Sequence, residues 1–515
     1  MKKFPFTIVL MMYIMKSVSG QGLFNKYYSV SGLSPINLLQ TSDSGYIITN
    51  SPAIGGSYDF SLIKLNALGD TLWTRSYGGP DEENFEAIDQ TADGGYILAG
   101  FTSSFSNAFH IYLIRTNSLG DTLWTKLLMA PQNGTAESIQ QTTDGGFIIT
   151  GGVLTSVFLE VGLIKTDSMG NIQWSKSYGN NYSQQGNCVL QTSDGGYIVT
   201  GTIDGFGAGN SDALLIKTDV NGNIMWDYTY GGLDNDIIYA ICKNYNGYIL
   251  AGFTKSFGAG PYDVYLIRTD LNGTILWSKT YGGPGSEEAW SVERTTDGGF
   301  IAAGYTYSFG GGNTDAYLLK INQNGDTLWT KTYGDNGSQD AYSFLQTSDS
   351  GLAFSGISSI PFQSVRLYVV KTDTSFSNVC NMNSTATIVS AAPTQTTPLV
   401  EVTSTPVLTT TSTPTIIGRG GAINDLCSYL NIPVNIQNFH FEISPNPVNN
   451  ILTINSISYP IKKIEIINML GKNVETIISN HSTNLSINVT GLDPDIYILK
   501  AETEIGIQSE IFIKQ

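Results

Sequence analysis

The sequence predicts an all-β protein: a seven-bladed β-propeller followed by a small C-terminal β-sandwich. Three observations favour this fold. A stretch of about fifty residues recurs along most of the chain, each copy holds four short strand patterns, and turns rich in Gly, Asn and Asp separate them. The chain of 515 residues contains 56 Gly and 11% aromatic residues, which suits an all-β protein with many tight turns.

The repeat is clearest at residues 191–232, which read QTSDGGYIVTGTIDGFGAGNSDALLIKTDVNGNIMWDYTYGG. An Asp-Gly-Gly turn joins its first and second strands, and an Asn-Gly turn joins its third and fourth strands. Turns of this kind connect antiparallel neighbours. Other copies predict a first strand at 138–141, a second at 96–100, a third at 316–321 and a fourth at 327–333.

The number of copies predicts how the ring closes. A Trp marks the fourth strand six times, at Trp73, Trp124, Trp174, Trp226, Trp277 and Trp329. The third-strand pattern occurs seven times, and no Trp strand follows its last copy at 367–373. Residues 23–28, LFNKYY, match LWTKTY at 328–333 with Phe in place of Trp. We therefore expect the N-terminal strand to complete the seventh blade, which leaves no free edge; an open solenoid is the alternative.

Composition divides the chain into four segments. Residues 1–20 have a basic start, an apolar run at 4–15 and a small residue at the end, as in a secretory signal peptide; a short membrane anchor is the alternative. The propeller is expected over 21–380. Residues 381–438 are rich in Thr, Ser and Pro, which predicts an extended linker with or without short strands. We expect no later membrane span.

The C-terminal segment, 439–515, has alternating apolar runs that predict a small β-sandwich. It resembles the type A sorting domain of the type IX secretion system of Bacteroidota. The matching motifs are SPNP at 444–447, IEIINMLGK at 464–472, VTGL at 489–492, IYILK at 496–500 and FIK at 512–514.

This resemblance implies a cellular location and one partner. It implies export across the outer membrane by the type IX machinery, removal of the domain, and either attachment to the cell surface or release. Asp495 departs from the family, which usually has Gly there, and this puts one turn in doubt. The propeller repeats resemble those of uncharacterised secreted Bacteroidota proteins, a resemblance that names no activity.

Charge and cysteine content exclude some partners. The chain has 26 basic and 43 acidic residues, a net charge of −17, which argues against nucleic acid and anionic membrane surfaces as partners. Cys188 and Cys242 are interpreted as small buried residues. Cys380 and Cys427 flank the linker, and whether they form a disulfide in this secreted chain is open.

Repeated residues are interpreted as structural. The third strand carries a basic residue in every copy: Lys64, Arg115, Lys165, Lys217, Arg268, Lys320 and Lys371. Five residues before each stands an acid, except at His110 and Arg366. The Asp- and Asn-rich turn at 219–223 suggests calcium, but the full loop with its distal Glu is absent, and turn chemistry accounts for these residues.

Candidate binding residues are sought where the copies disagree, in the longer loops on one face of the ring. Acidic and aromatic residues gather there, and the candidate ligand-binding residues are Trp290, Glu287, Glu288, Tyr342, Asp340, Tyr262, Glu82 and Glu83. Aromatic rings that stack on a sugar and carboxylates that accept its hydroxyl hydrogens would suit a glycan. A solvated acidic rim is the alternative.

No motif in the sequence predicts a catalytic, metal-binding or cofactor-binding site. The chain has three His, and we find no nucleophile elbow, phosphate loop or metal-spaced Cys/His cluster, so no catalytic residue, metal or cofactor is expected. The leading hypothesis is a secreted or cell-surface binding or adhesion protein whose ligand is a glycan or a protein. A carboxylate-dependent carbohydrate-active enzyme and a structural surface or matrix component are the alternatives.

Overall fold

The computed structural model describes residues 23–28, 37–374 with short gaps, short stretches between 382 and 425, and 441–514 with short gaps. The described residues form β-strands and no helix, so none of their elements is a helix that could cross a membrane. The chain divides into two compact units, Met1–Ser428 and Tyr429–Gln515. The all-β fold class is confirmed.

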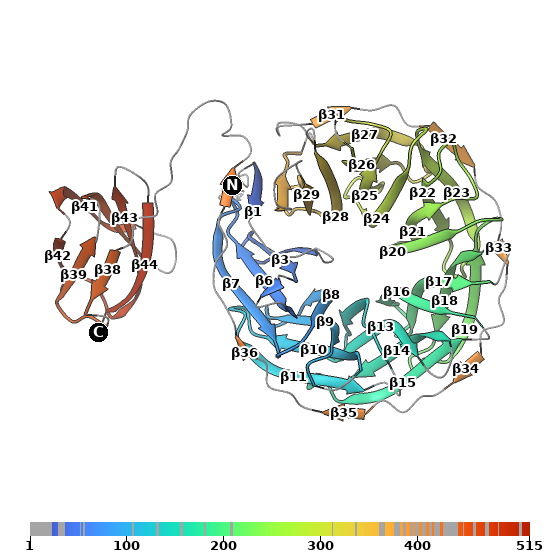
Figure 1. Cartoon of the computed structure of the whole chain (residues 1–515), viewed down its shortest axis with the longest axis horizontal. Helices are drawn as coiled ribbons and strands as arrows, with labels where there is room; N and C mark the ends of the chain where they lie inside the picture. The colour runs from blue at the N-terminus through green and yellow to red at the C-terminus, as the bar shows by residue number, and fades with distance from the viewer. Residues whose placement is uncertain are drawn as a thin grey trace, which may run out of the picture. The chain divides into compact units, whose positions relative to one another are not determined.

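The first unit is a ring of seven five-stranded antiparallel sheets, a β-propeller (Figure 1). The innermost strands, in blade order, are β2 (Leu38–Gln40), β8 (Glu83–Gln90), β12 (Ser138–Gln141), β16 (Gln184–Gln191), β20 (Asp236–Asn244), β24 (Glu287–Arg294) and β28 (Ser338–Gln346). The second strands are β3 (Tyr46–Asn50), β9 (Tyr96–Thr102), β13 (Phe147–Leu154), β17 (Tyr197–Asp204), β21 (Gly247–Thr254), β25 (Phe300–Thr306) and β29 (Leu352–Ser359).

The third strands are β6 (Phe60–Leu65), β10 (His110–Thr116), β14 (Leu159–Thr166), β18 (Ser211–Thr218), β22 (Asp263–Thr269), β26 (Asp315–Ile321) and β30 (Arg366–Lys371). The fourth strands are β7 (Thr71–Gly78), β11 (Thr122–Met129), β15 (Ile172–Gly179), β19 (Ile224–Tyr230), β23 (Ile275–Gly282), β27 (Thr327–Tyr333) and, for the seventh blade, β1 (Phe24–Tyr28). A small hairpin, β4 (Ala53–Ile54) with β5 (Ser57–Tyr58), extends from the first blade.

The N-terminal strand closes the ring as the sequence predicts. β1 pairs antiparallel with β30, from Phe24 opposite Lys371 to Tyr28 opposite Leu367. The Tyr28 hydroxyl donates a hydrogen bond of 2.6 Å to the carbonyl of Gly69 in the first blade. The equivalent Tyr of the fourth strand makes the same bond at other junctions, so closure repeats an ordinary blade contact.

The apolar core lies between neighbouring blades. Ile198 and Leu215 of the fourth blade pack in one buried cluster with Ile241 and Leu250 of the fifth. Burying each such side chain contributes about 1.5–3 kcal/mol. Because each blade presents an apolar face to its neighbour, the second and third strands are buried almost throughout.

Residues 382–425 add a fifth, outermost strand to each sheet. The sequence interpretation places an extended linker here, whereas these residues pair with the propeller. In chain order the strands are β31 (Met382–Ser384), β32 (Ile388–Ala391), β33 (Gln395–Thr396), β34 (Glu401–Thr403), β35 (Leu408–Thr410), β36 (Thr415–Ile416) and β37 (Ile423–Asp425). They visit the blades in reverse order, from β27 to β7, and end on β1. This belt covers the outer edge of every sheet, where backbone groups would otherwise be unpaired.

The second unit contains two sheets around one core. The strands are β38 (Phe441–Ser444), β39 (Ile451–Ser456) and β42 (Asn484–Asn488) in one sheet, and β41 (Asn473–Ser482), β40 (Ile461–Asn468), β43 (Asp495–Thr503) and β44 (Ile507–Lys514) in the other. Leu452 and Ile487 of the first sheet are buried in one cluster with Ile464, Leu499 and Phe512 of the second. The unit is therefore the expected β-sandwich.

Two expectations, the signal peptide and the open question of a Cys380–Cys427 disulfide, fall outside the described residues. The signal peptide at 1–20 lies there, as do Cys380 and Cys427. Cys188 and Cys242 are described as free thiols.

Candidate functional site

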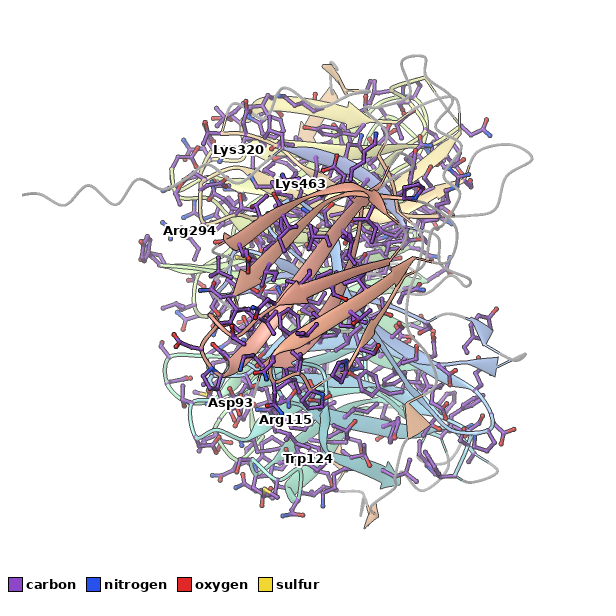
Figure 2. All side chains as sticks on the ribbon, turned by 90° about the vertical axis from the view of Figure 1, so that its left-hand side faces the viewer. Asp93, Arg115, Trp124, Arg294, Lys320 and Lys463 are labelled. Atoms are coloured by element: carbon purple, nitrogen blue, oxygen red, sulfur yellow. The ribbon has the colours of Figure 1, made fainter. Side chains whose placement is uncertain are left out.

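One ion pair recurs in six blades and explains the repeated charges. It joins the buried cation of the third strand to the Asp of the turn between the first and second strands, as Figure 2 shows for Arg115 and Asp93. The pairs are Lys64–Asp43, Arg115–Asp93, Lys165–Asp144, Lys217–Asp194, Lys320–Asp297 and Lys371–Asp349. Burial alone would raise the pKa of Asp297, but hydrogen bonds from Lys320 and Thr295 lower it to about 2. These residues build the turn.

The fifth blade lacks the pair for a visible reason. Asn246 stands where the other turns have Asp. The cation of this blade, Arg268, donates instead to the backbone carbonyl of Gln323 in the next blade. The repeated cation is therefore retained as a donor to a turn even where its carboxylate is missing.

Two predicted site residues, Glu83 and Glu287, are placed inside the scaffold. Both are fully buried. One oxygen of Glu287 accepts the backbone N–H of Gly283 at 2.7 Å and the other accepts the Thr306 hydroxyl at 2.6 Å. Glu83 makes the same two contacts in its own blade. Their carboxylates hold loop backbone and are not presented to a ligand.

Two more predicted residues lie away from the centre of the ring. Glu82 is exposed. Tyr262 packs edge-on against Phe253, with ring centroids 5.1 Å apart, and the Lys255 ammonium lies 4.6 Å from the Tyr262 ring. Neither residue lines the central cavity described below.

In five blades, a β-bulge in the inner strand aims one side chain toward the ring centre. In β24 the register passes from Ala289 opposite Gly304 directly to Ser291 opposite Ala303, so Trp290 is the extra residue. The same shift occurs in β8, β16, β20 and β28. Bulges re-aim side chains and are frequent beside binding sites.

Glycine opposite each bulge makes this geometry possible. A Cβ added at Gly304 would lie 1.8 Å from the carbonyl oxygen of Glu288, and one at Gly356 would lie 1.7 Å from that of Asp340. A side chain cannot be accommodated at such distances, so the backbones approach only because both positions are Gly. The first blade has Asn50 at this position, and its described inner strand is only three residues long.

The bulge residues and their third-blade equivalent line a central cavity of about 770 Å³. We call this set the bulge ring; in blade order it comprises Glu86, Glu137, Asn187, Tyr239, Trp290 and Tyr342. It has two unlike sides. Carboxylates occupy the second and third blades, Asn187 the fourth, and aromatic rings the fifth to seventh.

The aromatic side brings four predicted site residues together. The rings of Trp290 and Tyr342 stack with centroids 4.3 Å apart and planes inclined by 16°. The Trp290 Nε1–H donates to Glu288 at 3.1 Å, which fixes the indole. Burial raises the pKa of Glu288, while hydrogen bonds from Tyr305 and Trp290 oppose the shift. Burial, together with the charge of Glu288, raises the pKa of Asp340.

The acidic side is a pair of coupled carboxyls. Burial, followed by the charge of Glu137, raises the pKa of Glu86 to about 8. Burial also raises the pKa of Glu137, but Thr135 and Gln185 both donate to it, at 2.9 and 2.8 Å. Glu86 accepts a side-chain hydrogen bond from Asn84 at 2.8 Å. With its pKa at about 8, Glu86 is therefore mainly protonated at pH 7.

Sequence reasoning missed Glu86, Glu137, Asn187 and Tyr239, although a pattern in the sequence points to them. Each stands five residues before the Thr, or in the fifth blade the Asn, that opens the turn after the first strand. Across the copies, this position changes from acid to amide to aromatic while the turn residues stay nearly constant. Alignment of the copies at that turn would have identified the bulge ring.

The comparisons with known proteins concern mainly the C-terminal unit. Residues 442–515 match the family described as "Secretion system C-terminal sorting domain". No curated protein matches the sequence. Among solved structures, Sqt1 from Chaetomium thermophilum is 7% identical with a TM-score of 0.36, and the alignment covers 67% of this chain and 99% of that one. An endo-1,5-alpha-L-arabinanase from Thermotoga petrophila RKU-1 is 10% identical with a TM-score of 0.27, covering 67% and 99%.

At these TM-scores the solved structures do not bear on activity. The C-terminal match does establish the location of the protein, because a sorting domain of this family directs its chain out of the cell. The chain thus carries a type IX secretion sorting domain, has the secretion machinery as one partner, and is secreted or located on the outer cell surface.

Proposed function

We propose that the propeller is a secreted or surface-displayed binding protein that holds a glycan in its central cavity. The observation that carries this proposal is the two-sided bulge ring: a stacked Trp290–Tyr342 pair on one side and the coupled carboxyls Glu86 and Glu137 on the other. The sorting domain supports the location in which such a protein would meet its ligand.

The chemistry of the two sides supports a sugar ligand. The apolar face of a pyranose ring stacks on indole and phenol rings, and carboxylates accept hydrogen bonds from its hydroxyls. The cavity of about 770 Å³ lies within the usual range of ligand pockets. Because Trp290 is held by both Glu288 and Tyr342, the stacking surface is preorganised before any ligand arrives.

A glycan array probed with the full-length protein tests this proposal. We expect a defined set of glycans to bind, and Trp290→Ala to reduce that binding at least about tenfold through loss of the stacking surface. Trp277→Ala is the matched control, because Trp277 belongs to a fourth strand and donates to the Gln323 carbonyl outside the cavity. Absence of binding to every glycan, with the protein folded, would overturn the proposal.

A carboxylate-dependent carbohydrate-active enzyme is the second candidate, favoured by the raised pKa of Glu86. A carboxyl that stays protonated near neutral pH is suited to act as a general acid beside an ionised partner. Incubation of the bound glycans with the protein separates the two candidates. Shortened products that disappear in the Glu86→Gln variant would establish the enzyme, whereas intact glycans support binding alone.

A further inference from the structure

The central cavity has an acidic and aromatic lining. Its described lining includes four carboxyl groups, those of Glu86, Glu137, Asp204 and Glu293. The same described lining contains no Lys, Arg or His. A neutral sugar would leave the ionised members of this set without a counter-charge, whereas a ligand with its own positive charge would supply one.

Two basic residues of the fifth and sixth blades lie against aromatic rings. The Lys255 ammonium lies 4.6 Å from the Tyr262 ring, and the Arg294 guanidinium lies 3.9 Å from the Tyr245 ring. Neither lines the cavity. Among the described lining residues, the acidic side therefore has no cationic side chain beside it.

The aromatic side suits the same kind of charge. Tyr239, Trp290 and Tyr342 occupy three consecutive blades of the bulge ring. The faces of aromatic rings attract ammonium groups, and Trp does so most strongly. Glu288 lies beside these rings: it accepts the Trp290 Nε1–H, and its charge raises the pKa of Tyr342 after the larger effect of burial. The Lys255 charge already acts on Glu288 and opposes the rise of its pKa that burial causes, so the affinity of this side for a cation rests on the three rings.

The geometry points to a glycan that carries free ammonium groups, such as a deacetylated amino sugar, as the ligand of the central cavity. This inference rests on the proposed glycan-binding function and narrows its ligand class. The sugar ring would stack on Trp290 and Tyr342, and its ammonium group would approach the Glu86–Glu137 pair. No bond is made or broken.

The proton that Glu86 holds at neutral pH gives such a ligand a pH-dependent affinity. Glu137 is the charged group that acts on Glu86, and the Asn84 amide donates to it. Because burial and the Glu137 charge raise the Glu86 pKa to about 8, a cation of fixed charge must displace a proton at neutral pH but not at pH 9. Such a cation should bind more tightly as the pH rises through 8.

Calorimetric titration of the full-length protein with three tetramers of β-1,4-linked glucosamine tests this inference. The first carries free amines, the second N-acetyl groups, and the third N-trimethyl groups whose charge does not depend on pH. We expect both cationic tetramers to bind at least about tenfold more tightly than the N-acetyl tetramer at pH 6.5. Affinity for the N-trimethyl tetramer should rise between pH 6 and pH 9. Glu86→Gln should remove the part of that rise around pH 8, whereas Glu293, whose pKa burial raises to about 7, should still contribute around pH 7.

Asp81→Asn is the matched control, because it removes the same charge from an exposed residue and should leave the pH profile unchanged. Thermal melting of each variant shows that it is folded. Equal or tighter binding of the N-acetyl tetramer would overturn the ammonium inference while leaving glycan binding intact. If no tetramer and no glycan on the array binds, the proposed function fails and this inference fails with it.

Discussion

The turn contacts and the bulge ring arise from the same repeat, but the copies agree at one and differ at the other. Six turns keep the ion pair between a buried cation and a turn Asp. The bulge ring presents Glu, Asn, Tyr or Trp at one equivalent position. A residue that the turn of its own blade requires is kept in six of the seven copies, whereas a side chain that points into the cavity is free to serve a ligand. Function in this repeat protein is therefore best sought where equivalent inner-strand positions diverge.

The largest effect is expected from blocking a bulge. In Gly304→Val, the new Cβ would meet the Glu288 carbonyl oxygen at 1.8 Å. We expect a loss of about 4 kcal/mol or more of propeller stability, because backbone on both strands must move. Differential scanning calorimetry measures this loss of stability. Gly145→Ala is the control: its Cβ has open space but a φ of 82°, so it should cost about 1–2 kcal/mol. Equal losses in the two variants would contradict this account of the bulge.

A buried carboxyl between the first two blades should make stability depend on pH. Burial, together with the charge of Glu83, raises the pKa of Asp59 from 3.8 to about 6. The folded state thus holds a proton more tightly than the unfolded state. This contribution is fully present below pH 3.8 and is lost as pH rises through about 6, a change of roughly 3 kcal/mol.

Asp59→Asn removes the titrating carboxyl, so a comparison of the variant with the native protein measures its contribution to stability. The variant and the native protein should have similar stability at pH 4, and the variant should be more stable at pH 8, as judged by melting curves at both values. Asp81→Asn provides the exposed control and should show no such difference. An Asp59→Asn protein that is less stable than the native one at pH 8 would contradict the assignment of this pH dependence to Asp59.

A smaller loss is expected when a repeated turn loses its acid. Asp297→Ala leaves the buried Lys320 ammonium without its carboxylate partner, which lies at 2.7 Å. We expect a cost of about 2 kcal/mol, measured as a shift in the melting temperature. The fifth blade supplies the matched change, Asn246→Ala, because Arg268 there donates to the Gln323 carbonyl instead. That change should cost within about 0.5 kcal/mol; the reverse order would refute the assigned roles.

The sequence predicted most of the fold because its information is local. The Asp-Gly-Gly turns, the alternating strands and the Phe24 match to the Trp strands indicate which strands pair, and β1 pairs as expected. The belt of outermost strands, β31 to β37, could not be predicted from such local patterns. Its strands are two to four residues long, and their pairing with β27 through β7 depends on a ring already closed.

The candidate site was predicted only in part, for a related reason. Trp290 and Tyr342 stand out in the sequence because their residue types are unusual for the repeat. Glu83 and Glu287 look equally promising, and only burial distinguishes them as supports for loop backbone. Glu86 and Glu137 were recognised as site residues only from the bulge geometry of the inner strands. No turn motif in the sequence predicts that bulge.

A paired measurement on Trp290→Ala and Trp277→Ala tests the central claim most directly. Glycan affinity and melting temperature would be determined for both variants of the full-length protein. Trp290 lines the cavity, so its loss should abolish binding with little change in melting temperature. Trp277 packs between blades, so its loss should lower the melting temperature and leave the affinity of the folded protein unchanged. Binding that survives Trp290→Ala, or is lost in folded Trp277→Ala, would contradict the separation of scaffold from bulge ring.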